Sequence, residues 1–247
     1  MKESTDLRGL KSMAISLLYT DIHKTDFSPL VVTHPFTNSG IVSVLKDGER
    51  KLLDITQSEE DEQLWRSGLA KEIREAQTPV QIFTMINKPY LLTFMKFAEP
   101  YLSRKDFSGM FGEAWITSEA PHQDVNVSKE ESVTFFKQCD AEVLMEEDER
   151  ELLANLSDPL TIYRGVTSHN ADTVEALSWS LSRNTADWFA HRFGEEGRVF
   201  EAKIDKENVL ALFSVRGEQE VIVDPKHLYD IQESFEETET FNFTQKM

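Results

Sequence analysis

The order of the predicted elements indicates an α+β fold, with helices first and strands later. Up to about residue 155, most apolar residues recur at helical spacing. After Asn155, short β-patterned runs separated by polar turns predominate, and one clear helix interrupts them. Segregated helices and strands are typical of α+β domains, whereas alternating α/β folds interleave the two.

Composition favours a globular cytoplasmic protein. The 247 residues are enough to bury a substantial core, and no apolar run approaches the roughly 20 residues that span a bilayer. The first residues, Met1 to Asp6, lack the basic-then-apolar layout of a secretory signal. Cys139 is the only cysteine, which suits a reducing compartment and excludes a cluster of thiolate metal ligands.

A formal net charge of −18 argues against passive nucleic-acid binding, which usually shows a basic surface. Much of the charge lies in two runs, 146–149 and 233–239. We interpret these runs as solvated helix faces and an acidic tail that aids solubility. A docking surface for a basic partner is the alternative.

The first part begins with a polar arm, residues 1–28, that contains one amphipathic helical piece. Strands are expected over 30–32, 41–45 and 51–55, and the turn signal Asp47-Gly48 predicts a hairpin between the last two. Helices are expected from Ser58 to about Ala76, from Tyr90 to about Glu113 with a break at Pro100, and after the capping box at Ser128. An apolar run covers 80–86.

The second part carries predicted strands over 161–166, 199–204, 209–213, 220–223 and 228–231. A helix is expected over 184–193, with Asn184 as its N-cap and Asp187 in its first turn. Strand ends in this part hold the polar residues of interest.

Three short motifs could bind and cleave a charged ligand. Arg164 ends a strand and could grip two phosphate oxygens, while Gly165 would let a ligand approach the backbone. Ser178 and Ser180 are two residues apart, and so are Glu218 and Glu220, so each pair would share one face of an extended chain. Taken singly, a surface arginine, a common serine pair and a solvated pair of glutamates are the simpler explanations.

Taken in order, the motifs resemble the Arg–Ser–Glu class of mono-ADP-ribosyltransferases. Tyr163-Arg164-Gly165, Leu177 to Leu181 and Glu218 to Val223 match its three motifs, with Trp179 where threonine is usual. The resemblance implies a split β-sandwich core preceded by helices, and NAD as substrate. It implies that Glu220 is the catalytic carboxylate, that Ser178 positions it, and that Glu218 deprotonates the acceptor; Ser180 is assigned with Arg164 and Gly165 to NAD binding.

The helix after the serines adds to this resemblance. In the binary-toxin branch, a phenylalanine at about the position of Phe189 stacks on nicotinamide, and an arginine one turn later, here Arg192, meets phosphate. Trp115 is a candidate to cover the adenine. The implied domain covers 29–232, with a hairpin and helical part over 29–160 and a catalytic β core over 161–232, followed by an acidic tail over 233–247.

The expected activity is cleavage of nicotinamide from NAD and transfer of ADP-ribose to a macromolecule. The Glu-x-Glu pair resembles the arginine-modifying subgroup, so protein arginine is the favoured acceptor. An RNA or DNA base, water in an NAD glycohydrolase, and a non-catalytic NAD-binding module are the alternatives. We expect an intracellular toxin of a toxin–antitoxin or antiviral defence system, or a phage effector, with a neutralising antitoxin protein as partner. The six histidines are scattered, so no metal is expected.

Overall fold

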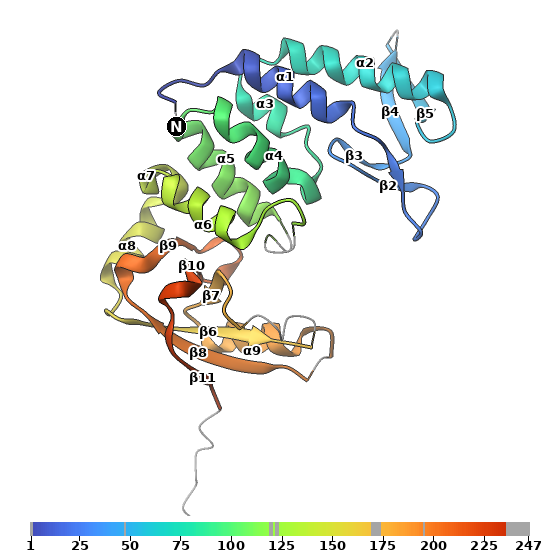
Figure 1. Cartoon of the computed structure of the whole chain (residues 1–247). Helices are drawn as coiled ribbons and strands as arrows, with labels where there is room; N and C mark the ends of the chain where they lie inside the picture. The colour runs from blue at the N-terminus through green and yellow to red at the C-terminus, as the bar shows by residue number, and fades with distance from the viewer. Residues whose placement is uncertain are drawn as a thin grey trace, which may run out of the picture. The chain divides into compact units, whose positions relative to one another are not determined.

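A helical unit, Met1–Glu146, and a sheet-centred unit, Glu147–Met247, make up the chain in the computed structural model (Figure 1). The structure describes residues 2–46, 48–118, 121, 124–168, 174–194 and 196–235, without the side chains of Lys46, Phe193 and Arg216. Helices predominate in the first unit, and an antiparallel sheet forms the centre of the second. The α+β prediction is therefore confirmed.

The first unit is built on helices packed around an apolar core. Its helices are α1 (Leu7–Leu18), α2 (Glu59–Glu75), α3 (Pro79–Phe83), α4 (Leu91–Ala98), α5 (Arg104–Thr117), α6 (Lys129–Gln138) and α7 (Ala141–Leu144), with 3₁₀ turns η1 (Lys88–Tyr90) and η2 (Glu99–Tyr101). Capping residues fix several helix starts, because their side chains accept hydrogen bonds from backbone N–H groups left without helical partners. Ser58 caps α2 and Ser128 forms a capping box on α6, as predicted.

The segment expected as an N-terminal arm belongs to this core. Asp6 caps α1, and Leu10, Ala14 and Leu18 of α1 are fully buried. α1 contacts α2 and α3. An apolar stripe at helical spacing has been buried against neighbouring helices, so the first residues do not form a separate arm.

Two small sheets accompany these helices. β1 (His23–Lys24), β2 (Val31–His34) and β3 (Thr37–Ser39) form one antiparallel sheet, and β4 (Ile41–Lys46) pairs with β5 (Glu49–Asp54) in a hairpin. The predicted hairpin is confirmed, and Gly48 has the positive φ of 83° that its turn requires. Asp47, the other residue of the turn signal, lies outside the described residues. The first part of the apolar run 80–86 lies in the short helix α3, which ends at Phe83, and Thr78 and Gln81 make a capping box at its start.

His34 of β2 gives the first unit a testable pH dependence. Its side chain is fully buried, and burial, aided by the nearby positive charge of Arg66, lowers the pKa of His34 to about 4. Its Nδ1 accepts a hydrogen bond from the Phe36 N–H at 3.1 Å. Nε2 has no hydrogen-bond partner among the described residues. The ring is therefore held neutral in the fold.

We expect the fold to lose stability as the pH falls from about 6.5 to about 4. In this window the unfolded chain binds a proton at His34 and the folded chain does not. The free energy of unfolding is therefore lower at about pH 4 than at about pH 6.5, by roughly 3 kcal/mol. Urea unfolding across this pH range measures the effect. His34→Asn keeps an acceptor for Phe36 but cannot titrate, so a pH dependence identical to that of the unchanged chain would contradict the prediction.

The second unit is centred on six antiparallel strands in the order β11-β8-β6-β7-β10-β9. The strands are β6 (Leu160–Val166), β7 (Ser178–Ser180), β8 (Arg198–Ile204), β9 (Val209–Phe213), β10 (Glu220–Val223) and β11 (Tyr229–Glu233). Helices α8 (Glu147–Asn155) and α9 (Arg183–His191) accompany them, with 3₁₀ turns η4 (Arg192–Gly194), η5 (Lys206–Asn208), η6 (Val215–Gly217) and η7 (Pro225–His227). The strands predicted over 209–213 and 220–223 are found with those bounds.

The pairing of β6 differs greatly on its two sides. Every residue from Leu160 to Val166 pairs with β8, whereas only Tyr163 pairs with β7, opposite Ser180. The described strands thus form one continuous sheet with a weak seam between β6 and β7. No helix among the described parts of the chain has the length and apolar character needed to cross a membrane.

Helix α9 packs directly on β6 and β8, beside the sheet in Figure 1. Its buried Ala186 and Ala190 cluster with Val199 of β8, and Tyr163 packs against them. The helix begins at Arg183, because Ser182 accepts a hydrogen bond from the Thr185 N–H. The predicted cap, Asn184, is wrong by two residues: serine is as good a cap, and Ser182 lies two residues after the end of β7.

Candidate active site

The pairing of β7 with β10 brings the predicted serines and Glu220 together. Ser180 lies opposite Glu220, and Ser178 lies opposite Ile222. Residues that face each other across an antiparallel pair share one side of the sheet, as do alternate residues of one strand. The Ser178 hydroxyl donates a hydrogen bond to Oε1 of Glu220. A serine from one strand therefore fixes the orientation of a carboxylate from the next.

Arg164 is tied to the same group of residues. Its Nη1 donates to the carbonyl oxygen of Ser178 at 2.6 Å, close to the place where β6 and β7 are joined by a single residue pair. The side chain is 8% exposed, and its Nε has no hydrogen-bond partner among the described residues. Burial lowers the pKa of Arg164 to about 10, and the negative charge of Glu220 opposes this shift. The guanidinium thus remains cationic at neutral pH.

Ser180 connects β7 to the Glu-x-Glu turn. Its hydroxyl donates to the Glu218 carbonyl at 2.8 Å and accepts from the Ser182 N–H at 3.0 Å. The Ser180 hydroxyl thus donates its proton to a backbone carbonyl of the protein. Ser180 therefore positions Glu218 and the start of α9.

The backbone before Glu220 is not extended. The expectation that Glu218 and Glu220 share one face of an extended chain is therefore wrong. Strand β10 starts at Glu220, Glu218 ends the 3₁₀ turn η6 with φ −85° and ψ −18°, and Gln219 has a positive φ of 47°. The alternation of side chains in a strand therefore does not apply to Glu218. Glu218 is presented by a turn that the Ser180 hydroxyl holds.

Gly165 is required by helix packing. A Cβ added there would lie 2.1 Å from the Ala186 carbonyl oxygen and 2.6 Å from the Ala190 nitrogen. The expected close approach of a ligand at this glycine is thus replaced by a close approach of the α9 backbone. Gly197 also allows the close approach of α9, since a Cβ there would lie 2.1 Å from the Ala190 carbonyl oxygen.

Phe189 and Arg192 lie together at the end of α9. The Arg192 guanidinium stacks over the half-buried Phe189 ring at 5.0 Å from its centroid, and Trp188 packs edge-on against the same ring. Trp188 is 62% exposed, so this end of the helix presents aromatic surface to solvent. The predicted residues thus form two groups on neighbouring elements: Arg164, Ser178, Ser180, Glu218 and Glu220 in one, and Phe189 and Arg192 in the other.

The two tryptophans singled out by the sequence are both buried. Trp179, found where threonine is usual, is 2% exposed, and its indole N–H donates to the Ala176 carbonyl at 2.8 Å. Trp179 is therefore a core residue of the second unit. Trp115 is 1% exposed and packs against Phe111 and Phe136 of the first unit. The suggestion that Trp115 covers an adenine is wrong, because a side chain buried among aromatic residues has no surface to offer.

Glu149 is a residue that the sequence interpretation missed. It was assigned to a solvated acidic run, yet it is 4% exposed and accepts a hydrogen bond from the Ser214 N–H at 2.6 Å. Ser214 begins the turn η6 that leads to Glu218. Its spacing from Leu152 and Leu153 in α8, at i+3 and i+4, was the signal that Glu149 shares the apolar face.

The site offers carboxylate and guanidinium chemistry. In the described part of the chain, no group of three or more His, Cys, Asp and Glu side chains is arranged to hold a metal ion. Burial raises the pKa of the Cys139 thiol to about 12, so this thiol stays protonated at neutral pH. The second unit thus provides a carboxylate oriented by a hydroxyl, a neighbouring buried cation, and a second carboxylate on an anchored turn.

No family model, curated protein or solved structure matches this chain.

Proposed function

We propose that this chain is an NAD-dependent mono-ADP-ribosyltransferase whose catalytic residues lie in the second unit. One observation carries the proposal: Ser178 donates to the Glu220 carboxylate across adjacent strands, while Arg164 donates to the carbonyl of the same serine. The three residues are 14 and 42 positions apart along the chain. Their convergence supports the resemblance of the motifs beyond sequence order alone.

The proposed reaction uses the positive charge already present in NAD. The bond between the nicotinamide nitrogen and ribose C1′ breaks, and its electron pair neutralises the pyridinium, so no acid has to protonate the leaving group. The ribose becomes oxocarbenium-like, and the oriented carboxylate of Glu220 stabilises this developing charge. An acceptor nitrogen then bonds to C1′, and Glu218 takes the proton that the acceptor loses.

Arg164, Phe189 and Arg192 are suited to binding NAD. The Nε of Arg164 is buried and has no hydrogen-bond partner among the described residues. Because buried donors are usually hydrogen-bonded, this N–H is suited to binding a phosphate oxygen of NAD. Arg192 is exposed next to the Phe189 ring, so a phosphate and an aromatic ring could be bound side by side at the end of α9. Gly165 is not assigned to ligand binding, because α9 occupies its open side.

The proposed acceptor is a protein arginine. Glu218, on a turn anchored by Ser180, can pair with a guanidinium before accepting its proton. The net charge of −18 favours a cationic acceptor over RNA or DNA. We further propose that the enzyme is a toxin or phage-conflict effector that acts inside the cell that makes it and is neutralised by an antitoxin protein.

The decisive experiment is incubation with NAD labelled in its adenine ring and a whole-cell lysate. We expect macromolecules to become labelled, and we expect protease, but not nuclease, to release this label. Nuclease-sensitive label would favour a nucleic-acid acceptor, and free ADP-ribose without macromolecular label would favour a glycohydrolase. Intact NAD under all conditions would contradict the enzymatic proposal.

Arg164→Ala is expected to weaken NAD binding by about 10- to 100-fold, since a charge-assisted hydrogen bond is worth about 1.5–3 kcal/mol. Arg164→Lys should recover only part of the affinity, because a point charge lacks the planar fork. Calorimetric titration with NAD measures both. Arg198→Ala is the matched control, since Arg198 is an exposed arginine of β8 in the same sheet. Equal affinity of the folded Arg164→Ala and Arg198→Ala proteins would remove Arg164 from the site.

Expression of the chain alone in a host cytosol is expected to arrest growth, and Glu220→Gln should relieve the arrest. A catalyst modifies many targets or depletes NAD, whereas a binding module acts only stoichiometrically. Colony counts after induction, at matched levels of soluble protein, measure this. Unimpaired growth with the active enzyme would exclude the toxin proposal and leave the transferase chemistry standing.

A further inference from the structure

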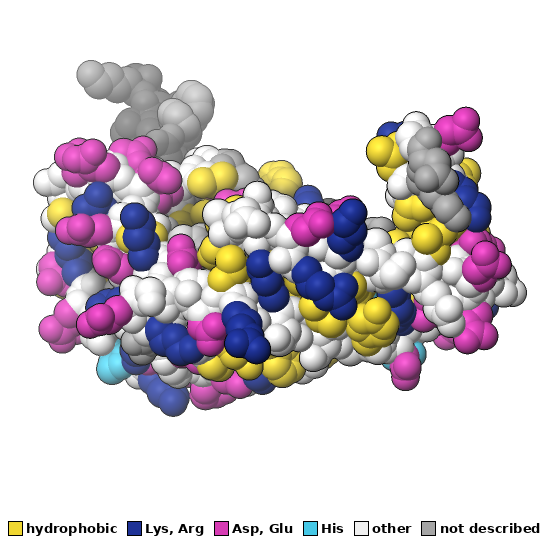
Figure 2. Space-filling view, turned by 90° about the horizontal axis from the view of Figure 1, so that it is seen from above, with side chains coloured by type: hydrophobic (Ala, Val, Ile, Leu, Met, Phe, Trp, Pro, Cys, Tyr) yellow, Lys and Arg dark blue, Asp and Glu magenta, His cyan; other side chains and the backbone are white. Residues whose placement is uncertain are grey.

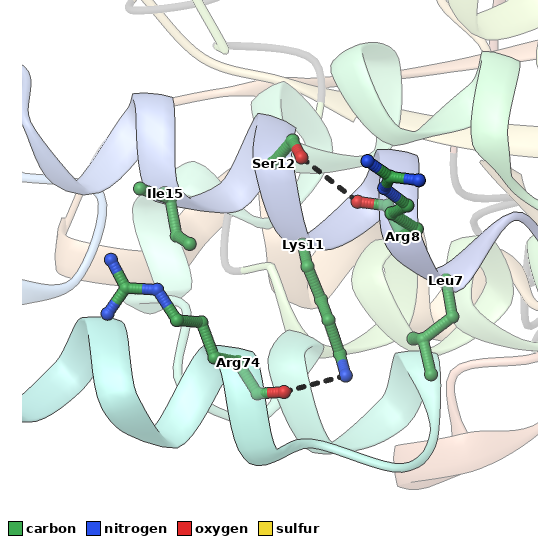
Figure 3. Close-up of a pocket in the computed structure, with 6 residues that line it drawn as sticks. All are labelled: Leu7, Arg8, Lys11, Ser12, Ile15 and Arg74. Carbon is green, nitrogen blue, oxygen red and sulfur yellow. Dashed lines mark hydrogen bonds between the residues drawn. The ribbon is translucent and has the colours of Figure 1, made fainter.

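The first unit contains a groove between α1 and α2 that none of the proposed chemistry uses. It has a volume of about 420 Å³ and is lined by Leu7, Arg8, Lys11, Ser12 and Ile15 of α1 and by Arg74 of α2 (Figure 3). Figure 2 views the molecule from above Figure 1, and in the middle of this view basic and hydrophobic side chains lie together with some acidic ones. On a chain of net charge −18, such a surface is unusual.

Carboxylates of the described residues offset the positive charges of the groove only in part: the pKa of Asp6 is lowered mainly by the hydrogen bond from the Gly9 N–H and, among smaller effects, by the charge of Arg8. Lys11 extends to α2, where its Nζ donates to the Arg74 carbonyl oxygen at 2.8 Å (Figure 3). Among the described residues, no carboxylate forms an ion pair with Arg8, Lys11 or Arg74. The nearest acidic neighbours in sequence have other partners, since Asp6 pairs with Lys2 and Glu75 pairs with Lys71.

Apolar surface accompanies these charges. Leu7 and Ile15 mark the two ends of the α1 wall, and both are only half-buried. They are separated by about 12 Å along the helix axis, which is the span of about four residues of extended chain. The helix contributes no acidic side chain between Leu7 and Leu18. The groove therefore has the size, charge and polarity to receive a short peptide.

We propose that this groove binds a short acidic segment of a partner protein, with glutamate or aspartate side chains on Arg8, Lys11 and Arg74 and apolar side chains on Leu7 and Ile15. The proposal is independent of the transferase activity. Charge complementarity selects the acidic residues, and the half-buried leucine and isoleucine select their apolar neighbours.

A nucleic acid is a less suitable occupant than an acidic peptide. Its phosphates extend far beyond a site of this length, and they would meet the acidic remainder of the surface. A phosphate backbone also leaves Leu7 and Ile15 without apolar contacts. A short peptide places its charges within the groove and reaches little beyond it.

The test is a fluorescence anisotropy titration of the full chain with a labelled peptide of about eight residues that alternates glutamate with leucine, a length that covers the groove with a margin. We expect saturable binding that weakens with added salt. The double variant Arg8→Gln/Arg74→Gln should weaken it by about tenfold, as expected for two partly exposed charge contacts. Both side chains are exposed, and Lys11 is left to hold α1 and α2 together.

Lys71→Gln is the matched control, because Lys71 is an exposed cation of the same helix that does not line the groove. Unchanged peptide binding in this variant supports the proposal. An equal loss in Lys71→Gln would show a general charge effect and overturn it. Absence of binding, equal binding of a glutamine–leucine peptide, or stronger binding of a single-stranded oligonucleotide would each overturn it as well.

Discussion

Glu220→Gln is expected to slow nicotinamide release from NAD by about 10²–10³-fold, the size of effect seen when a group that stabilises transition-state charge is removed. Glutamine has nearly the same shape, and its carbonyl oxygen can still accept the hydrogen bond that Ser178 donates. The change therefore removes charge and leaves the pairing of β7 with β10 in place. Release of nicotinamide under single-turnover conditions measures the chemical step.

Glu218→Gln is the matched control for this prediction. The proposed division of work assigns cleavage to Glu220 and acceptor activation to Glu218, so Glu218→Gln should keep most NAD cleavage and lose macromolecular labelling. Since Ser180 bonds the backbone carbonyl of Glu218, the side-chain change leaves that anchor intact. Loss of cleavage to the same extent in both variants would disprove the division, and full activity of Glu220→Gln would disprove the site.

Gly165→Ala is expected to destabilise the second unit by about 3 kcal/mol or more, at the upper end of overpacking effects. The added methyl group would lie 2.1 Å from the Ala186 carbonyl oxygen and 2.6 Å from the Ala190 nitrogen. Both are helix backbone atoms, so relief requires moving α9 as a whole away from β6. Chemical denaturation followed by the fluorescence of Trp179 and Trp188 measures the loss.

Gly68→Ala provides the contrast. Gly68 is exposed in the middle of α2, and beyond its chain neighbours and the nearby backbone of its own helix no described atom lies within 4 Å of the Cβ that would be added. Removing the flexibility of glycine there should stabilise the first unit by about 0.5–1 kcal/mol. Equal and small effects of the two substitutions would mean that α9 does not rest on Gly165 as closely as described.

Local signals in the sequence predicted local structure well. The caps Ser58 and Ser128, the hairpin around Gly48 and the strand Glu220–Val223 all depend on residues close together in the chain. Such local signals did not predict which residues are buried by segments far away in the chain. α1 was expected as part of an arm because its partners α2 and α3 lie more than 40 residues further along the chain.

For the candidate site too, the sequence predicted the local motifs but not how they come together. The sequence placed Arg164, Ser178 and Glu220 in three separate motifs, and their joining depends on a strand order that only the folded sheet reveals. The role of Gly165 could not be predicted, because a glycine for ligand approach and a glycine for helix approach look identical in sequence. For Glu149, helical spacing indicated burial, but its partner could not be predicted, because the Ser214 N–H lies 65 residues away.

The seam between β6 and β7 gives Arg164 a mechanical part in the second unit. Among the described residues, the pairing of Tyr163 with Ser180 and one guanidinium-to-carbonyl bond link the half-sheet β11-β8-β6 to the half-sheet β7-β10-β9, and α9 contacts strands of both halves. Under the proposed function, an anion bound by the Arg164 Nε, which has no partner among the described residues, leaves the Nη1 bond to Ser178 in place, whereas an anion that also takes Nη1 must compete with the Ser178 carbonyl. Under the proposed function, NAD binding at Arg164 should therefore change amide exchange in β7, and unchanged exchange would show that the seam does not respond to the ligand.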